Sequence, residues 1–232
     1  MEIRVLVDAG AVAKEAAKAI AAEARAAVAT RGRFIVAVSG GHTPRVMLRA
    51  LAGEKVPWQA VHVVQVDERV APAGHPDRNL THLRESLLDH APLRAEQVHP
   101  MPVEENALAQ AAERYSLELR AVAGSPPVLD LVHLGLGLDG HTASLFPGDP
   151  ALDVSDAEVA LTGVYQGRCR MTLTYPLLNR ARRVLWVVTG SEKAGMIVRL
   201  RDGDASIPAG RVSQAHALVL ADQGAAGQLE TP

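Results

Sequence analysis

The sequence predicts an α/β fold of the doubly wound, three-layer αβα kind, with a mostly parallel sheet between two layers of helices. Short β-rich runs alternate with helical stretches to the end of the chain, which is typical of stacked βαβ units. Most of the β-rich runs are continuously apolar, as expected for parallel strands buried on both faces. With 232 residues and no low-complexity linker, we expect one domain over residues 1–232.

The first half of the chain begins with a long helix and then alternates. The expected elements are a helix at 9–30, a strand at 34–38, a helix at 43–51, a strand at 61–66, and helices at 75–88 and 103–122. Asp8 is a suitable N-cap for the first helix, whose many alanines favour the helical state. In the last of these helices Leu108, Ala112 and Tyr115 recur on one face, which should therefore be buried.

The second half of the chain continues the alternation after a turn. The sequence Gly-Ser-Pro-Pro at 124–127 ends the preceding helix and is expected to form a loop inside the domain. The apolar run from Leu129 to Leu134 predicts a buried parallel strand. Further strands are expected at 159–164, 169–173, 184–188 and 217–220, and a helix at 192–201.

Composition disfavours several classes of protein. The 24 basic and 26 acidic residues form no block of like charge, so a nucleic-acid partner is not expected. No segment reaches the ~20 apolar residues that cross a bilayer, and residues 1–8 carry charges where a secretory signal would be apolar. We expect a cytoplasmic protein without a membrane partner, and either a monomer or a homodimer.

Cysteine and histidine spacing disfavours a metal site. The single cysteine, Cys169, rules out an intrachain disulfide and a multi-cysteine metal site. Its basic neighbours leave a reactive thiol open, although a half-buried strand cysteine is favoured. The nine histidines lack the spacings of zinc hydrolases, and a Gly-x-Ser-x-Gly nucleophile motif is missing. We expect no metal and no cofactor, and any hydrolysis should use a histidine and water.

The most informative segment follows the expected strand at 129–134. Glycines at positions 135, 137 and 140 surround Asp139 and precede His141. In open α/β sheets ligands bind beyond the carboxyl ends of the strands, where a histidine can take a proton from water. Asp139 either orients the imidazole or caps the turn. The alternative to a reactive loop is a tight turn with a surface histidine.

The turn Ser39-Gly-Gly-His-Thr-Pro44 lies between an expected strand and an expected helix. Gly40 and Gly41 let backbone N–H groups face a ligand, and Thr43 offers a hydroxyl or a helix cap. A strand, a glycine turn and a helix N-terminus together suit a phosphate. The motif is neither a Walker sequence nor a full dinucleotide fingerprint, and an ordinary helix cap is the alternative.

Charged side chains also follow other expected strands. Arg69 can grip a phosphate in a forked geometry, while Asp67 or Glu68 holds the arginine or binds sugar hydroxyls. Asn79 stands near a helix start, where it is as easily a cap as a ligand. Basic residues that would add charge to the same rim are Arg170 and Lys193. Local ion pairs or solvated surface residues are the alternative for the charged groups.

In their order and approximate spacing these motifs resemble the 6-phosphogluconolactonase family, which is related in fold to glucosamine-6-phosphate deaminase and ribose-5-phosphate isomerase (NagB/RpiA-like, Rossmann-like). The matching segments are 39–44, 67–69, 75–79, 135–147, 170–174, 190–194 and 207–209, and they span nearly the whole chain. The resemblance implies a single sugar-phosphate lactonase domain. It also implies metal-independent hydrolysis of 6-phospho-D-glucono-1,5-lactone to 6-phospho-D-gluconate in the oxidative pentose phosphate pathway.

The resemblance further implies roles for individual residues. His141 matches the general base that activates water, with Asp139 beside it, and the phosphate is expected on the Ser39–Pro44 turn and on Arg69. The implied substrate-binding residues are Gly40, Gly41, Thr43, Asp67, Arg69, Asn79, Gly137, Gly140, Ser144, Arg170 and Lys193.

Two residues depart from the family pattern. His42 stands where a small residue is usual, and Arg78 replaces a common serine. The backbone motif can persist if both side chains point away from the ligand. An exposed His42 would make phosphate binding depend on pH.

Two rival functions are open. The deaminase and isomerase relatives continue with an Asn-Glu-Pro type sequence after the histidine, whereas Ser144-Leu-Phe-Pro147 offers no carboxylate here. A sugar-phosphate-binding regulator that lost activity is the other rival. Such regulators usually carry a DNA-binding helix-turn-helix, and we expect none in the few residues before the first helix.

Overall fold

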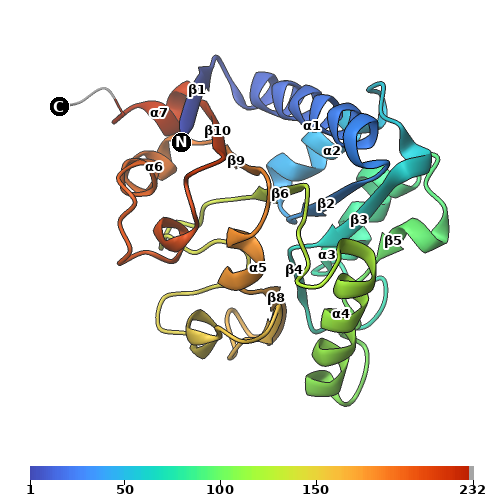
Figure 1. Cartoon of the computed structure of the whole chain (residues 1–232). Helices are drawn as coiled ribbons and strands as arrows, with labels where there is room; N and C mark the ends of the chain where they lie inside the picture. Colours follow the sequence, from blue (N-terminus) through green and yellow to red (C-terminus); the bar gives the residue numbers. More distant parts are fainter. Residues whose placement is uncertain (230–232) are drawn as a thin grey trace.

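In the computed structural model, which describes residues 1–229, helices cover both faces of a central parallel sheet (Figure 1). In spatial order its strands are β1 (Glu2–Leu6), β10 (Ala217–Asp222), β9 (Val184–Val188), β6 (Leu131–Leu134), β2 (Phe34–Val38), β3 (Val61–Gln65) and β5 (Val98–His99). Every neighbouring pair in this sheet runs parallel. The predicted fold class is confirmed.

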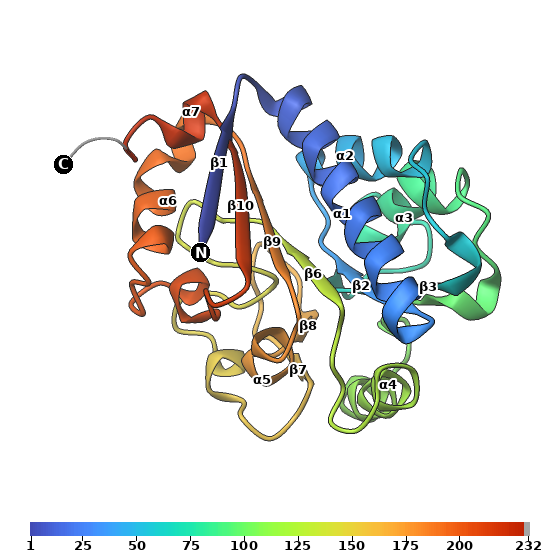
Figure 2. The ribbon, with the colours of Figure 1, turned by 45° about the horizontal axis from the view of Figure 1, so that its top comes forward.

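Successive strand residues point to opposite faces and enter two apolar cores. Phe34 and Val36 of β2 pack with α1 (Ala9–Arg31) and α2 (His42–Ala52), whereas Ile35 lies in the core on the other face. Figure 2 shows α1 and α6 on opposite sides of the strands. The buried residues of α1 are mostly alanines, so that this long helix can lie close to the sheet.

The remaining helices cover the second face or connect strands. They are α3 (Asn79–Leu83), which continues as one π-helical turn at Arg84–Leu88, α4 (Leu108–Ala123), α5 (Tyr175–Asn179), α6 (Ala194–Arg201) and α7 (Gln223–Ala226). Single 3-10 turns occur at Trp58–Ala60, Ala95–Gln97, Pro150–Asp153, Ser191–Lys193 and Pro208–Arg211. No helix within residues 1–229 is long and apolar enough to span a membrane.

A second, antiparallel sheet was not predicted. Its strands are, in spatial order, β4 (Asp67–Arg69), β8 (Arg170–Leu173) and β7 (Val159–Leu161). The sequence predicted strands at 159–164 and 169–173 but gave no sign that they leave the main sheet. The register of β4 on β8 sets Arg69 directly opposite Arg170, which matters for the site described below.

The edge strand β1 was not predicted, and two helices begin later than expected. The strand β1 was missed because Glu2 and Arg4 interrupt its apolar pattern, as an exposed edge strand allows. The helix expected at 75–88 begins only at Asn79, where the distant Glu68 carboxylate accepts the first backbone N–H groups. The helix expected at 103–122 begins at Leu108, after a turn that contains Glu104.

Candidate active site

A cleft of about 410 Å³ opens at the carboxyl ends of β2, β3 and β6, beside the antiparallel sheet. Predicted site residues that line it are Gly40, Gly41, Asp67, Arg69, Asn79, Gly137, Asp139, His141, Arg170 and Lys193. The cleft thus unites segments that lie far apart in the sequence.

Three predicted residues lie in the wall behind the cleft. They are not among the residues of the described range 1–229 that line it. The hydroxyl of Thr43 lies 2.9 Å from that of Thr189, so it is already engaged. Ser144 is fully buried and donates its hydroxyl to Asp67 Oδ2 at 2.6 Å. At Gly140 a Cβ would approach Ile207 Cβ to 2.6 Å. These residues support the wall of the cleft, and direct contact of each with a substrate stays a prediction.

His141 and Asp139 form a hydrogen-bonded pair at the edge of the cleft. The ring Nδ1 of His141 lies 2.5 Å from Asp139 Oδ1, and the same oxygen accepts the backbone N–H of His141 at 3.1 Å. Asp139 therefore both orients the imidazole and closes the turn. Because the carboxylate holds the proton on Nδ1, Nε2 keeps a lone pair that can accept a proton.

The charge of Asp139 is stabilised by the same contacts. Burial alone raises the pKa of this carboxyl, but the hydrogen bonds from the backbone and ring of His141 outweigh burial and leave the pKa below its ordinary value. The carboxylate consequently stays ionised through the neutral range and can stabilise an imidazolium.

Arg69 and Arg170 bring two guanidinium groups to one side of the cleft. They stand opposite each other on β4 and β8, and like charges in such a pair repel. Burial, and secondly the charge of Arg69, lower the pKa of Arg170. In residues 1–229 the Nε atom of each side chain is buried without a hydrogen-bond partner. This arrangement favours an anion between the two groups.

Asp67 and Asn79 form the floor beside these arginines. The Asn79 Nδ2 atom donates to the backbone oxygen of Asp67 at 2.9 Å and to its Oδ1 at 3.3 Å. The Asn79 Oδ1 atom points at Gly40, where a Cβ would come within 1.9 Å of it. Gly40 is thus required by close approach, and the floor leaves little freedom to either side chain.

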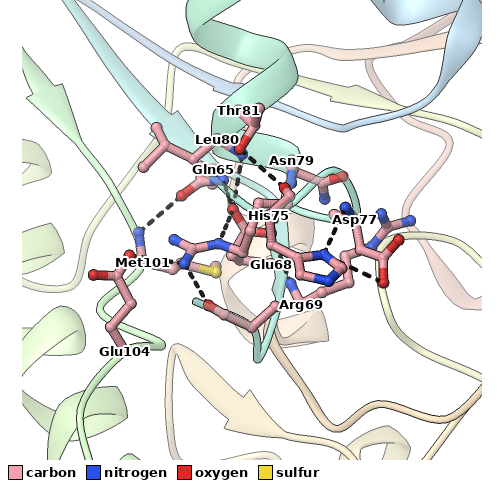
Figure 3. Close-up of polar contacts among 12 residues, drawn as sticks. Gln65, Glu68, Arg69, His75, Asp77, Asn79, Leu80, Thr81, Met101 and Glu104 are labelled. Atoms are coloured by element: carbon pink, nitrogen blue, oxygen red, sulfur yellow. Dashed lines mark hydrogen bonds and ion pairs between the residues drawn. The ribbon is translucent and has the colours of Figure 1, made fainter. Parts of the chain in front are cut away.

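Glu68 lies behind the cleft and fixes its neighbours. Its carboxylate accepts the backbone N–H groups of Asn79 and Leu80, each at 2.8 Å, and the side-chain amide of Gln65 at 2.9 Å (Figure 3). Arg78, only 2% exposed, pairs with Glu68 at 3.1 Å. Arg78 therefore points away from the cleft, which explains how an arginine fits where the family usually has serine.

The Ser39–Gly41 segment lies between β2 and α2. The Ser39 hydroxyl donates to the backbone oxygen of His133 at 2.8 Å. Gly41 has φ of 120°, a conformation that favours glycine, and leads directly into α2. His42 is exposed and lines a groove between α1 and α2, away from the cleft. The side chain of His42 therefore does not line the cleft, and its expected effect on phosphate binding stays a prediction.

Aromatic residues that the sequence did not single out complete the cleft. Tyr165 and Gln166 line it, and the Tyr165 ring stacks on Phe146 with 3.7 Å between ring centroids. The ring of His141 lies 4.8 Å from that of Phe146. The one sequence signal for Tyr165 is the Gln-Gly pair that follows it, a turn dipeptide between two expected strands.

The structure also shows the environment of Cys169 and the arrangement of side chains that could bind a metal ion. Cys169 is partly buried next to β8, and it forms no disulfide. No group of three or more His, Cys, Asp or Glu side chains in residues 1–229 is arranged to hold a metal ion.

Comparison with known proteins identifies the family to which the chain belongs. The family model described as glucosamine-6-phosphate isomerases/6-phosphogluconolactonase matches residues 7–220. A 6-phosphogluconolactonase of Synechocystis is 43% identical over 160 residues, which cover 67% of this chain and 66% of that protein, just under two thirds of its length. A 6-phosphogluconolactonase of Streptomyces coelicolor is 34% identical over 213 residues, which cover 83% of this chain and 80% of that protein. The crystal structure of a Thermotoga maritima 6-phosphogluconolactonase matches with a TM-score of 0.85 at 27% identity, over 95% of this chain and 98% of that one.

Proposed function

The chain belongs to the glucosamine-6-phosphate isomerase/6-phosphogluconolactonase family, and we propose that it hydrolyses 6-phospho-D-glucono-1,5-lactone to 6-phospho-D-gluconate in the oxidative pentose phosphate pathway. One observation carries this proposal. The His141–Asp139 pair and the Arg69–Arg170 pair open into the same cleft, so that a base and an anion site face one ligand.

The proposed chemistry needs one base and no covalent intermediate. A δ-lactone is an activated ester, so positioning and proton transfer supply most of the acceleration. His141 Nε2 takes a proton from water as the water oxygen bonds to the lactone carbonyl carbon. The tetrahedral intermediate then collapses, the bond from C1 to the ring oxygen breaks, and the imidazolium returns its proton to that oxygen. Asp139 stabilises the imidazolium meanwhile.

The phosphate end of the substrate supplies orientation. We assign the phosphate to the Ser39–Gly41 segment and to Arg69, with Arg170 and Lys193 adding positive charge. A dianion suits two forked guanidinium groups. Because the phosphate is remote from the carbonyl, its binding energy can be used to hold the lactone against His141.

Hydrolysis is favoured over the deamination and isomerisation known in the same family. Those reactions need a carboxylate after the histidine, and in this chain Ser144 is buried against Asp67 while Phe146 packs beneath the ring of His141. Release of ammonia from glucosamine 6-phosphate at a catalytic rate would reverse this preference.

Substitution of the base tests the proposal. We expect purified wild-type protein to hydrolyse the lactone in a stopped-flow assay, and His141→Ala to lower kcat by roughly 10²–10⁴. The exposed His216 provides the control, since His216→Ala should leave kcat unchanged. A wild-type rate in His141→Ala would exclude His141 as the base.

A further inference from the structure

Tyr165 is held over the cleft by a short hairpin. Tyr165 and Arg168 exchange backbone hydrogen bonds, and the two residues between them, Gln166 and Gly167, have φ of 49° and 78°. Positive φ at both central positions is the geometry of a tight type I′ turn. Arg168 Nε donates to Asp77 Oδ2 at 2.6 Å and ties the hairpin to the turn before α3. The hairpin therefore fixes the backbone position from which the Tyr165 side chain extends.

The ring of Tyr165 lies flat on a buried support. It stacks on Phe146 at an interplanar angle of 9°, and Phe146 is 3% exposed. Phe146 also contacts the ring of His141, so the imidazole and the phenol both pack on the same phenylalanine ring. The guanidinium carbon of Arg170 lies 5.3 Å from the centre of the Tyr165 ring, within cation–π range.

The hydroxyl of Tyr165 reaches the other half of the catalytic pair. It donates to Asp139 Oδ2 at 3.3 Å, whereas Oδ1 of the same carboxylate serves His141. Burial raises the pKa of Tyr165, and the charge of Asp139 raises it further, so the phenol remains protonated at neutral pH and acts as a donor. Both oxygens of Asp139 are thus occupied by side-chain donors.

We propose that Tyr165 is a positioning residue for the proposed lactonase reaction, on which this inference rests. Its hydroxyl fixes the plane of the Asp139 carboxylate, and the carboxylate in turn aims His141 Nε2 at the attacking water. Its ring forms the wall beside Arg170. One residue thereby links the end of the cleft where water attacks to the end that takes the phosphate.

Removal of the hydroxyl has two physical consequences. The carboxylate gains rotational freedom, which lowers the fraction of molecules with a correctly aimed imidazole. The carboxylate also loses a donor that draws charge from it, so it stabilises the imidazolium more strongly. Tyr165→Phe should therefore lower kcat about five- to tenfold, leave KM within about twofold, and move the acid limb of the kcat/KM profile to higher pH.

A double-mutant cycle separates positioning from general structure. If Tyr165 acts through Asp139, Tyr165→Phe has no further effect on kcat in an Asp139→Asn background. Val164→Ala is the matched control, because Val164 precedes Tyr165 in the same hairpin and is 72% exposed. Independent effects that multiply in the double variant, or a wild-type kcat in Tyr165→Phe, would overturn the proposal.

A measurement without substrate keeps this inference distinct from the proposed function. NMR titration of the His141 ring in the ligand-free protein should show a higher midpoint in Tyr165→Phe than in wild type, and an equal midpoint in Val164→Ala. If the wild-type protein fails to hydrolyse the lactone, the proposed function is lost while this titration still decides whether Tyr165 acts on the pair. Equal midpoints in wild type and Tyr165→Phe would count against the coupling.

Discussion

At position 137 the chain has no room for a side chain, because the His141–Asp139 pair lies directly over the backbone. A Cβ on Gly137 would approach His141 Nδ1 to 2.1 Å and Asp139 Oδ1 to 2.7 Å. At the residue scale, the geometry of the His141–Asp139 pair therefore depends on the missing side chain at Gly137 as much as on the two polar side chains. The same holds at Gly40, which lies against the amide of Asn79.

Gly137→Ala tests this dependence. The φ angle of Gly137 lies outside the left-handed region, so alanine should not strain the backbone there. The added methyl group would act only by displacing the His141–Asp139 pair. We expect kcat to fall by roughly 10² or more, as for loss of a positioned base, with little change in the midpoint of thermal unfolding. Gly53→Ala, where a Cβ makes only an ordinary 3.5 Å contact, is the control. Full activity in Gly137→Ala would refute the role of this close approach.

At the scale of elements, β6 and the loop after it carry two histidines in opposite environments. His141 follows the strand and lines the cleft, whereas His133 lies within it and is fully buried. The Nδ1 atom of His133 accepts the backbone N–H of Ser39 at 3.3 Å, so the strand also supports the Ser39–Gly41 segment. Burial lowers the pKa of His133 from 6.5 to about 4, which keeps its ring neutral.

His133 predicts a dependence of stability on pH. A buried neutral imidazole binds a proton less readily in the folded than in the unfolded state, so its contribution is complete above pH 6.5 and is lost as the pH falls toward 4. Between pH 7 and pH 5 this residue should lower the free energy of unfolding by about 2 kcal/mol. In urea titrations at the two pH values, His133→Asn should lose less stability on acidification than wild type by that amount. Identical losses would contradict the account.

The bounds of the helices and strands also show which of them local sequence can predict. The predicted start of α3 was misplaced because no local side chain caps this helix. Its first backbone N–H groups are accepted instead by Glu68, which lies in the strand β4. The strands of the main sheet were largely predictable, since continuous apolar runs such as 34–38 and 184–188 need burial on both faces. The edge strand β1 lacks such a run.

At the scale of the whole molecule, the cleft forms because a small antiparallel sheet stands beside the ends of the parallel one (Figure 1). The rule that ligands bind beyond the carboxyl ends of parallel strands was enough to predict that His141 and Gly40 lie together. It could not predict that β8 pairs with β4 and sets Arg170 against Arg69, nor that a hairpin carries Tyr165 to Asp139. These contacts depend on long-range pairing that leaves no local pattern.

The central claim is that one hexose phosphate bridges the histidine and the pair of arginines. A crystal structure with 6-phosphogluconate bound tests it most directly. We predict the phosphate between the guanidinium groups of Arg69 and Arg170, beside the Ser39–Gly41 segment, and the C1 carboxylate within roughly 2.6–3.2 Å of His141 Nε2. A phosphate bound elsewhere, or a C1 carboxylate turned away from His141, would contradict the account.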